Sequence, residues 1–158
     1  MKLLCSILVY LCNLLDTDCE YKLNKIDDTY YIFRHNNNEM YNIASIKIFQ
    51  ILFLYLPIIE VSDIFYTFNE KERKFIIYHE LGHYKLKHHL KFVNIHCLDD
   101  LNLLEQEADE YAMYKVGKEI ALKTLNKTRS VLQKFEKDNK YITERIENIE
   151  LKDEYACE

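Results

Sequence analysis

The sequence His79-Glu80-Leu81-Gly82-His83 constrains this chain more than any other stretch. On an α-helix, side chains four residues apart lie on one face, so His79 and His83 can present imidazole nitrogens to one tetrahedral metal ion. Glu80 stands one position round the helix from His79, where its carboxylate can hold and deprotonate a metal-bound water molecule. The apolar residues 75–77, directly before the motif, can bury the same helix against a core. The stretch therefore predicts a helix that carries two metal ligands and a base.

A second stretch, further along the chain, supplies carboxylates at helical spacing. A site with two histidines needs a third protein ligand and an open fourth position, and a carboxylate is a standard third ligand in catalytic zinc sites. Glu105 and Asp109 are four apart, so one can bind the metal while the other accepts the free N–H of a ligating imidazole. Glu107 faces elsewhere and is the backup ligand. Ala108 and Ala112 are small and also four apart, which allows this helix to lie close against the histidine helix.

Together the two motifs, HELGH and E-x-E-A-D-x-x-A, resemble those of the gluzincins, zinc peptidases whose third ligand is a glutamate on a second helix. Within that group the chain is most similar to the catalytic core of the HtpX and CAAX prenyl-endopeptidase group and to the single-domain minigluzincins. Residues 57–64 resemble the family's upper-rim strand, residues 69–72 the acidic start of its active-site helix, and residues 141–146 its late T-x-x-R-I segment. The ImmA/IrrE-type peptidases, which cleave repressors, share the HELGH and E-x-x-A-D patterns and are the second family that the chain resembles.

The resemblance implies roles for individual residues. One Zn²⁺ ion per chain would be bound by His79, His83 and Glu105, and Asp109 would orient a ligating imidazole. Glu80 would act as general base and then as general acid. The tetrahedral oxyanion needs a further donor, and the resemblance favours Arg145 for it. The other candidates for that donor are His88, His89, His96, Tyr111 and Tyr114, and the histidines among them are otherwise expected to be surface residues on the extended helix.

The function expected from these residues is that of a zinc-dependent endopeptidase acting on a peptide or protein substrate. An ImmA/IrrE-type regulatory peptidase and a latent zinc-binding regulatory module are the alternatives, and Glu80 argues against an inactive site. A wholly structural protein with incidental histidines is the third reading. The net charge of −5, with no basic cluster, argues against nucleic-acid binding.

The expected fold is an α+β, zincin-like metallopeptidase domain, with a small N-terminal sheet packed on a helical zinc-binding half. A length of 158 residues fits a single domain, 1–158, and two glycines and one proline leave no obvious linker. Short strands are predicted within residues 20–47, with turns at 27–28 and 36–38. A further strand at 58–62 is expected at a sheet edge, where it could bind an extended peptide.

Helices are predicted at about 70–92, 101–116, 118–138 and 141–152. Asn69 is the expected N-cap of the first, with Glu70 and Glu72 in its first turn, where the helix dipole favours carboxylates. Gly117 is expected to end the glutamate helix.

The N-terminal residues 1–15 are mostly apolar and are too short to span a bilayer as a helix. No small-residue cleavage site follows them, which favours a helix that backs the core over a secretory signal. Residues 48–59 form a second apolar run, interrupted by Pro57. A cytoplasmic protein is therefore expected, with membrane association of residues 1–19 as the alternative. Five cysteines, an odd number, are expected to be reduced thiols rather than a disulfide framework.

Overall fold

The computed structural model describes residues 2–16, 19–27, 29–36, 42–51, 54–91, 98–135 and 140–152. As predicted, the fold is α+β: a four-stranded sheet lies in the N-terminal part, and most of the remainder is helical. The chain divides into two compact units, Met1–Thr67 and Phe68–Glu158. This division concerns packing, and a single metallopeptidase domain over residues 1–158 stays a prediction.

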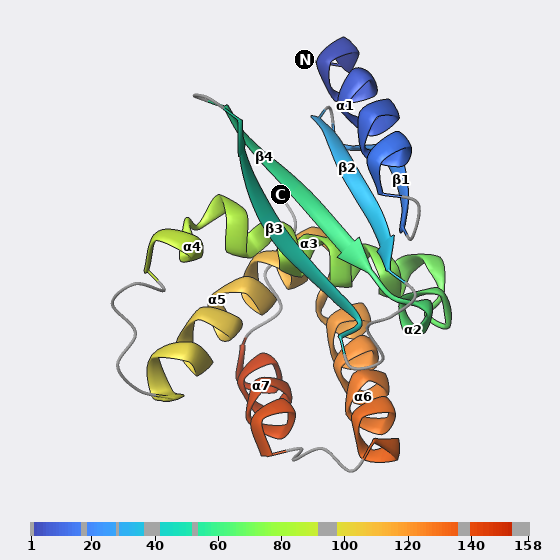
Figure 1. Ribbon diagram of the computed structural model, residues 1–158. Coiled ribbons are helices and arrows are strands. Elements are labelled where there is room, and N and C mark those ends of the chain that lie inside the picture. The colour runs from blue at the N-terminus through green and yellow to red at the C-terminus, as the bar shows by residue number, and fades with distance from the viewer. Residues whose placement is uncertain are drawn as a thin grey trace. The chain divides into compact units, whose positions relative to one another are not determined.

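The first unit contains the sheet and two helices (Figure 1). Its elements in chain order are α1 (Lys2–Leu15), β1 (Cys19–Ile26), β2 (Thr29–Asn36), β3 (Ala44–Ile51), β4 (Leu54–Val61) and the short α2 (Asp63–Tyr66). The strand order is β1-β2-β4-β3, in which β2 and β4 are parallel and the other two pairs are antiparallel. Asp27, in the turn predicted at 27–28, has a positive φ of 41°, and residue 28 lies outside the described residues.

β4 lies inside the sheet, so the prediction of an edge strand at 58–62 is wrong. Ile58 pairs with Ile32 of β2 on one side and with Lys47 of β3 on the other. The described residues of the apolar run 48–59 explain the error, because 48–51 of β3 pair antiparallel with 54–57 of β4, and β3 thereby covers one side of β4. The edge strands of the described sheet are β1 and β3.

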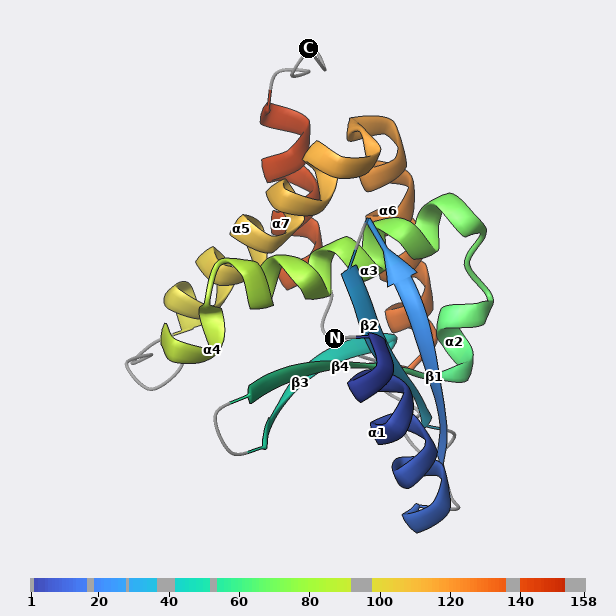
Figure 2. The same ribbon diagram turned by 90° about the horizontal axis from the view of Figure 1, so that it is seen from above.

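α1 is the helix predicted for residues 1–15, and it packs beside β1 (Figures 1 and 2). The Asn13 side chain fixes this contact: its Oδ1 accepts from the Tyr21 N–H at 2.8 Å, and its Nδ2 donates to the Tyr21 carbonyl at 3.0 Å. Among the residues that the structure describes, no helix combines the length and apolar character needed to cross a membrane. Cys5, Cys12 and Cys19 carry free thiols, whereas Cys97 and Cys157 lie outside the described residues.

The second unit is helical. It contains α3 (Glu70–Lys85), α4 (His88–Lys91), α5 (Leu98–Val116), α6 (Lys118–Lys134) and α7 (Lys140–Leu151). Asn69 caps α3 as predicted: its side chain accepts from the Glu72 N–H at 3.0 Å, and the Glu72 carboxylate accepts from the Asn69 N–H at 2.9 Å. Gly117 follows α5 with a φ of 91°, which confirms the predicted end of that helix.

The helix predicted to continue to residue 92 instead ends at Lys85. Lys87 adopts a φ of 58°, a left-handed conformation that breaks the helix, and α4 begins at the next residue. The sequence offers no glycine or asparagine at this point, the residues that usually mark such a break. The change in direction matters because it decides where His88 lies.

α3 and α5 lie side by side at very short range (Figures 1 and 2). A Cβ atom added to Gly82 would stand 3.1 Å from the Cα and 3.2 Å from the carbonyl oxygen of Ala108, both backbone atoms that a rotamer change cannot move aside. Ala108 and Ala112 are fully buried, which confirms the close approach expected from their size. The core behind this contact is apolar and consists of Phe75, Ala112, Met113, Ala121, Leu125, Ile142, Ile146 and Ile149.

Candidate metal centre

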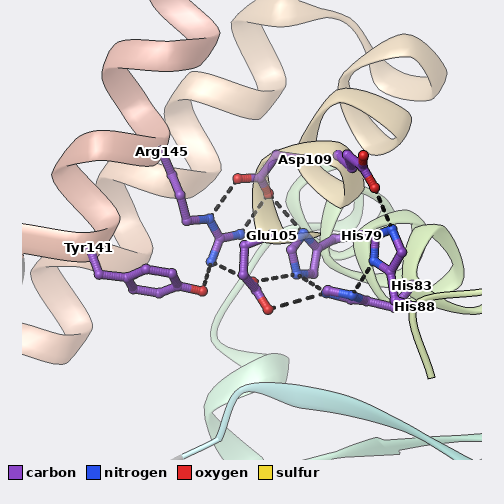
Figure 3. Close-up of polar contacts among 8 residues, drawn as sticks. His79, His83, His88, Glu105, Asp109, Tyr141 and Arg145 are labelled. Atoms are coloured by element: carbon purple, nitrogen blue, oxygen red, sulfur yellow. Dashed lines mark hydrogen bonds and ion pairs between the residues drawn. The ribbon is translucent and has the colours of Figure 1, made fainter. Parts of the chain in front are cut away.

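Three donor groups from α3 and α5 converge within the second unit (Figure 3). The Nε2 atoms of His79 and His83 are 3.2 Å apart. The Glu105 carboxylate places Oε2 at 3.2 Å from His79 Nε2 and Oε1 at 3.3 Å from His83 Nε2. A tetrahedral zinc site with bonds near 2.0–2.1 Å requires donors about 3.3 Å apart. The group could therefore hold a metal ion, and both its spacing and its donor atoms fit zinc.

Asp109 orients the first histidine of this group. Its Oδ1 accepts from His79 Nδ1 at 2.8 Å, and the carboxylate is 1% exposed. Arg145 of α7 donates to both Asp109 oxygens, from Nε and from Nη2, each at 2.6 Å. Burial alone would raise the pKa of Asp109, but the charges of Arg145 and His79 outweigh it and hold that pKa below its usual range. The carboxylate therefore stays ionised, and His79 Nε2 faces Glu105 and His83.

The charges around His79 favour a cation in the centre. Burial disfavours the protonated imidazole, but Asp109 and Glu105 outweigh it and raise the pKa of His79 to about 10. Burial likewise acts against an ionised Glu105, yet its hydrogen bond to His79 and the charges of His79 and Arg145 keep its pKa far below the usual range. Without metal, a proton is held between His79 and Glu105 at neutral pH. Metal binding must displace that proton, so binding strengthens as the pH rises.

Glu80 is buried beside the same charges, with 9% of its surface exposed. Burial raises the pKa of its carboxyl group, although His79 and His83 act in the opposite direction. Among the residues that the structure describes, its carboxylate has no hydrogen-bond partner. A buried carboxylate that is not engaged elsewhere, with a raised pKa, is suited to accepting and returning a proton near neutral pH.

Arg145 is buried, and its guanidinium contacts the carboxylates of Asp109 and Glu105. Its Nη1 lies 3.2 Å from Glu105 Oε2 and donates to the Tyr141 hydroxyl at 2.9 Å. The guanidinium is thus placed behind Glu105 and Asp109 (Figure 3). Its predicted role as an oxyanion donor stays a prediction. Tyr141 was not among the predicted site residues, although its position four residues before Arg145 places both on one face of α7.

His88 is fully buried, so the prediction of a surface residue on an extended helix is wrong for it. Its Nδ1 lies 2.9 Å from His83 Nδ1, and its Nε2 lies 2.9 Å from Glu107 Oε2. Glu107, the predicted backup ligand, contacts His88 instead of joining the three ligand atoms.

Of the other predicted donors, the three that the structure describes are not in the polar contacts of the centre. His89 is half-buried and stacks on Tyr84, with 6.2 Å between ring centroids. Tyr111 is half-buried and Tyr114 is 69% exposed. His96 lies outside the described residues.

Comparison with protein-family models, with curated proteins and with solved structures finds no match for this chain. The likeness to the gluzincins therefore rests on the motif residues alone. The geometry of those residues shows only that they could hold a metal ion.

Proposed function

We propose that this chain is a zinc-dependent endopeptidase with a zincin-like, gluzincin-type fold. The observation that carries the proposal is the convergence of His79, His83 and Glu105, whose ligand atoms all lie within 4.8 Å of one another. Two imidazoles and one carboxylate form a ligand set of catalytic zinc sites, which leave a position open for water or substrate. Bound there, one zinc ion per chain supplies a Lewis acid that polarises the scissile carbonyl and lowers the pKa of a water molecule.

The chain's own residues would perform the remaining steps. Glu80 accepts the proton of the attacking water and delivers it to the departing amine, which its raised pKa favours. Asp109 holds His79 with its Nδ1 protonated, so that its Nε2 lone pair is available. Arg145 keeps Asp109 and Glu105 ionised and in place. Its contacts favour this orienting role over direct stabilisation of the oxyanion.

The test compares zinc content and proteolysis across matched variants. Wild type, Glu80→Gln, Glu105→Gln and Glu110→Gln are purified without chelators, analysed for zinc, and incubated with casein as an unstructured substrate. Glu110→Gln is the control, because it makes the same chemical change on α5 at a half-exposed residue that pairs with Lys152. Wild type and Glu110→Gln are expected to bind one zinc ion and to cleave casein.

Glu80→Gln separates chemistry from binding: zinc should remain while cleavage is lost. Glu105→Gln should lose most of its zinc, since one of three protein ligands is weakened. Cleavage that persists at the wild-type rate in Glu80→Gln would contradict the assignment of Glu80 as the base. Zinc bound as expected without any cleavage would favour the latent regulatory module, or a peptidase confined to one protein substrate such as a repressor. Absence of metal from the wild type would overturn the proposal.

A further inference from the structure

His88 occupies an unusual place for a residue just beyond a helix. α3 ends at Lys85, and the left-handed φ of Lys87 turns the chain so that α4 starts at His88. That conformation is uncommon for a residue other than glycine and persists where the surrounding structure fixes it. The turn leaves the His88 side chain with no exposed surface and places it beside His83 (Figure 3). Its other ring nitrogen contacts Glu107.

The hydrogen bonds of His88 determine which nitrogen of His83 carries a proton. Glu107 Oε2 accepts from His88 Nε2, so this nitrogen carries the His88 proton. In the neutral imidazole, His88 Nδ1 is then an acceptor, and the atom that faces it, His83 Nδ1, must be the donor. His83 consequently has its lone pair on Nε2, the atom that lies 3.3 Å from Glu105 Oε1.

We propose that His88, held by Glu107, is the positioning residue of His83: it fixes the tautomer and ring plane with which His83 binds metal. The proposal rests on the metal-binding part of the proposed function and does not require proteolysis. Asp109 does the same for His79 through a direct carboxylate contact. His83 has no direct carboxylate contact at Nδ1, and the His88 imidazole links it to the Glu107 carboxylate instead. Each ligating histidine thus donates its Nδ1 proton away from the metal.

A histidine buried only for packing would not need this arrangement. Partners at both nitrogens satisfy His88 itself, but only the bond to His83 connects it to the metal ligands. Removing the groups that orient ligating histidines typically weakens metal binding 10–100-fold. A purely structural role predicts instead a loss of stability with unchanged zinc affinity per folded molecule.

The test uses two substitutions of His88 and one control. His88→Phe keeps a ring of similar size but removes the acceptor for His83. His88→Asn retains an acceptor, because its Oδ1 stands close to the place of Nδ1. His89→Phe is the matched control: it changes the neighbouring histidine, which stacks on Tyr84 and has no polar contact with His83. Zinc affinity is measured by competition with a chelating dye, and the tautomer of His83 by ¹H–¹⁵N NMR of the zinc-loaded, ¹⁵N-histidine-labelled proteins.

In the wild type, His83 is expected to carry its proton on Nδ1. His88→Phe should bind zinc about 10–100-fold more weakly. His88→Asn should lose less than about tenfold and keep the Nδ1–H signal of His83, and His89→Phe should match the wild type. The folded fraction of each metal-free variant, from circular dichroism, separates loss of affinity from loss of fold.

Four outcomes overturn the proposal. Wild-type affinity in His88→Phe would show that His88 does not position His83. A wild-type His83 with its proton on Nε2 would contradict the tautomer. Equal losses in His88→Phe and His88→Asn would show that the acceptor is not what matters. A wild type that binds no zinc would remove the metal site itself, whereas a wild type that binds zinc without cleaving casein would leave the role of His88 untouched and bear only on the peptidase assignment.

Discussion

Each unit of this protein contains one deeply buried carboxylate paired with an arginine, and the two sites differ in what else they contact. In the first unit, Glu60 of β4 is 3% exposed and bonds to Arg34 of β2, its direct neighbour in the strand register. Lys47 of β3 forms a second ion pair with it at 2.6 Å. In the second unit, Asp109 is 1% exposed and accepts from Nε and Nη2 along one edge of the Arg145 guanidinium.

The two buried carboxylates differ in what each contacts besides its arginine: Glu60 contacts Lys47, and Asp109 contacts His79. Both carboxyl groups have pKa values below the usual range because their cations outweigh the effect of burial. Glu60 is shared between two cations, one of which, Lys47, has half of its side chain exposed. Asp109 also accepts from His79 and so transmits its position to a candidate metal ligand. A buried ion pair alone is thus weak evidence for a functional site, and its connection to a ligand set makes it informative.

Among substitutions at the two buried carboxylates, Asp109→Asn should have the largest effect, on both stability and zinc affinity. It leaves Arg145 buried without its main counter-charge, and breaking a buried pair in this way costs about 3–5 kcal/mol. Zinc affinity should also fall about 10–100-fold, because the group that orients His79 is weakened. Urea unfolding and zinc titration measure the two effects. Asp100→Asn, at an exposed position on the same helix, is the control and should change neither.

The pH dependence of stability should differ between the units. The depressed pKa values of Glu60 and Asp109 contribute stability above the ordinary carboxyl pKa, which is lost in acid as the pH falls through the folded-state values. The pKa of His79, raised to about 10, acts in the opposite sense. Its contribution to the metal-free protein is complete below the unfolded value of about 6.5 and is lost as the pH rises towards 10.

Between about pH 6.5 and 10, the second unit should therefore lose more stability than the first, by a few kcal/mol, and zinc should prevent the loss because it replaces the proton. Unfolding in urea, followed by methyl NMR signals of Ile59 in the first unit and Ile146 in the second, separates the two units. An equal alkaline loss at both methyl groups, or a loss that zinc does not prevent, would contradict this account.

Glu60→Gln should have a smaller effect than Asp109→Asn, of about 1–3 kcal/mol. Glutamine keeps the shape and can still accept from Arg34, whose side chain is 24% exposed and can regain water. Zinc affinity should be unchanged, because the partners of Glu60 are Arg34 and Lys47 rather than a candidate metal ligand. Unfolding monitored at Ile59 and zinc titration provide the measurements. A drop in zinc affinity similar to that of Asp109→Asn would remove the distinction between the two buried carboxylates.

The features that could be predicted from the sequence are those fixed by neighbours along the chain. The capping box of Asn69 and the stop at Gly117 involve residues within one turn of helix. The spacing of Glu105 and Asp109 places both on one face of α5, and the buried Ala108 lets that helix approach Gly82 closely. The candidate ligands His79, His83 and Glu105 were predicted from the same four-residue helical spacing.

The features that could not be predicted depend on distant partners or on an unmarked backbone conformation. β4 became an interior strand because two strands from different parts of the chain cover it, which no local pattern of residues 58–62 reveals. His88 reached the metal centre because Lys87 adopts a left-handed conformation that its residue type does not signal. A helix continued past Lys85 would place His88 on the surface, whereas the observed turn at Lys87 buries it beside His83.

Lys47→Gln should have the smallest effect, because it removes only the more exposed of the two cations that contact Glu60. The Lys47 side chain is 51% exposed, and ion pairs of this kind contribute about 0–1 kcal/mol. Arg34 remains to compensate the charge of Glu60, so the sheet should stay folded, and the loss should shrink further at high salt. Urea unfolding of the wild type and the variant at low and at high salt measures this. A loss as large as that of Glu60→Gln would mean that Lys47, rather than Arg34, compensates the buried charge, and the likeness between the Glu60–Arg34 and Asp109–Arg145 pairs would then fail.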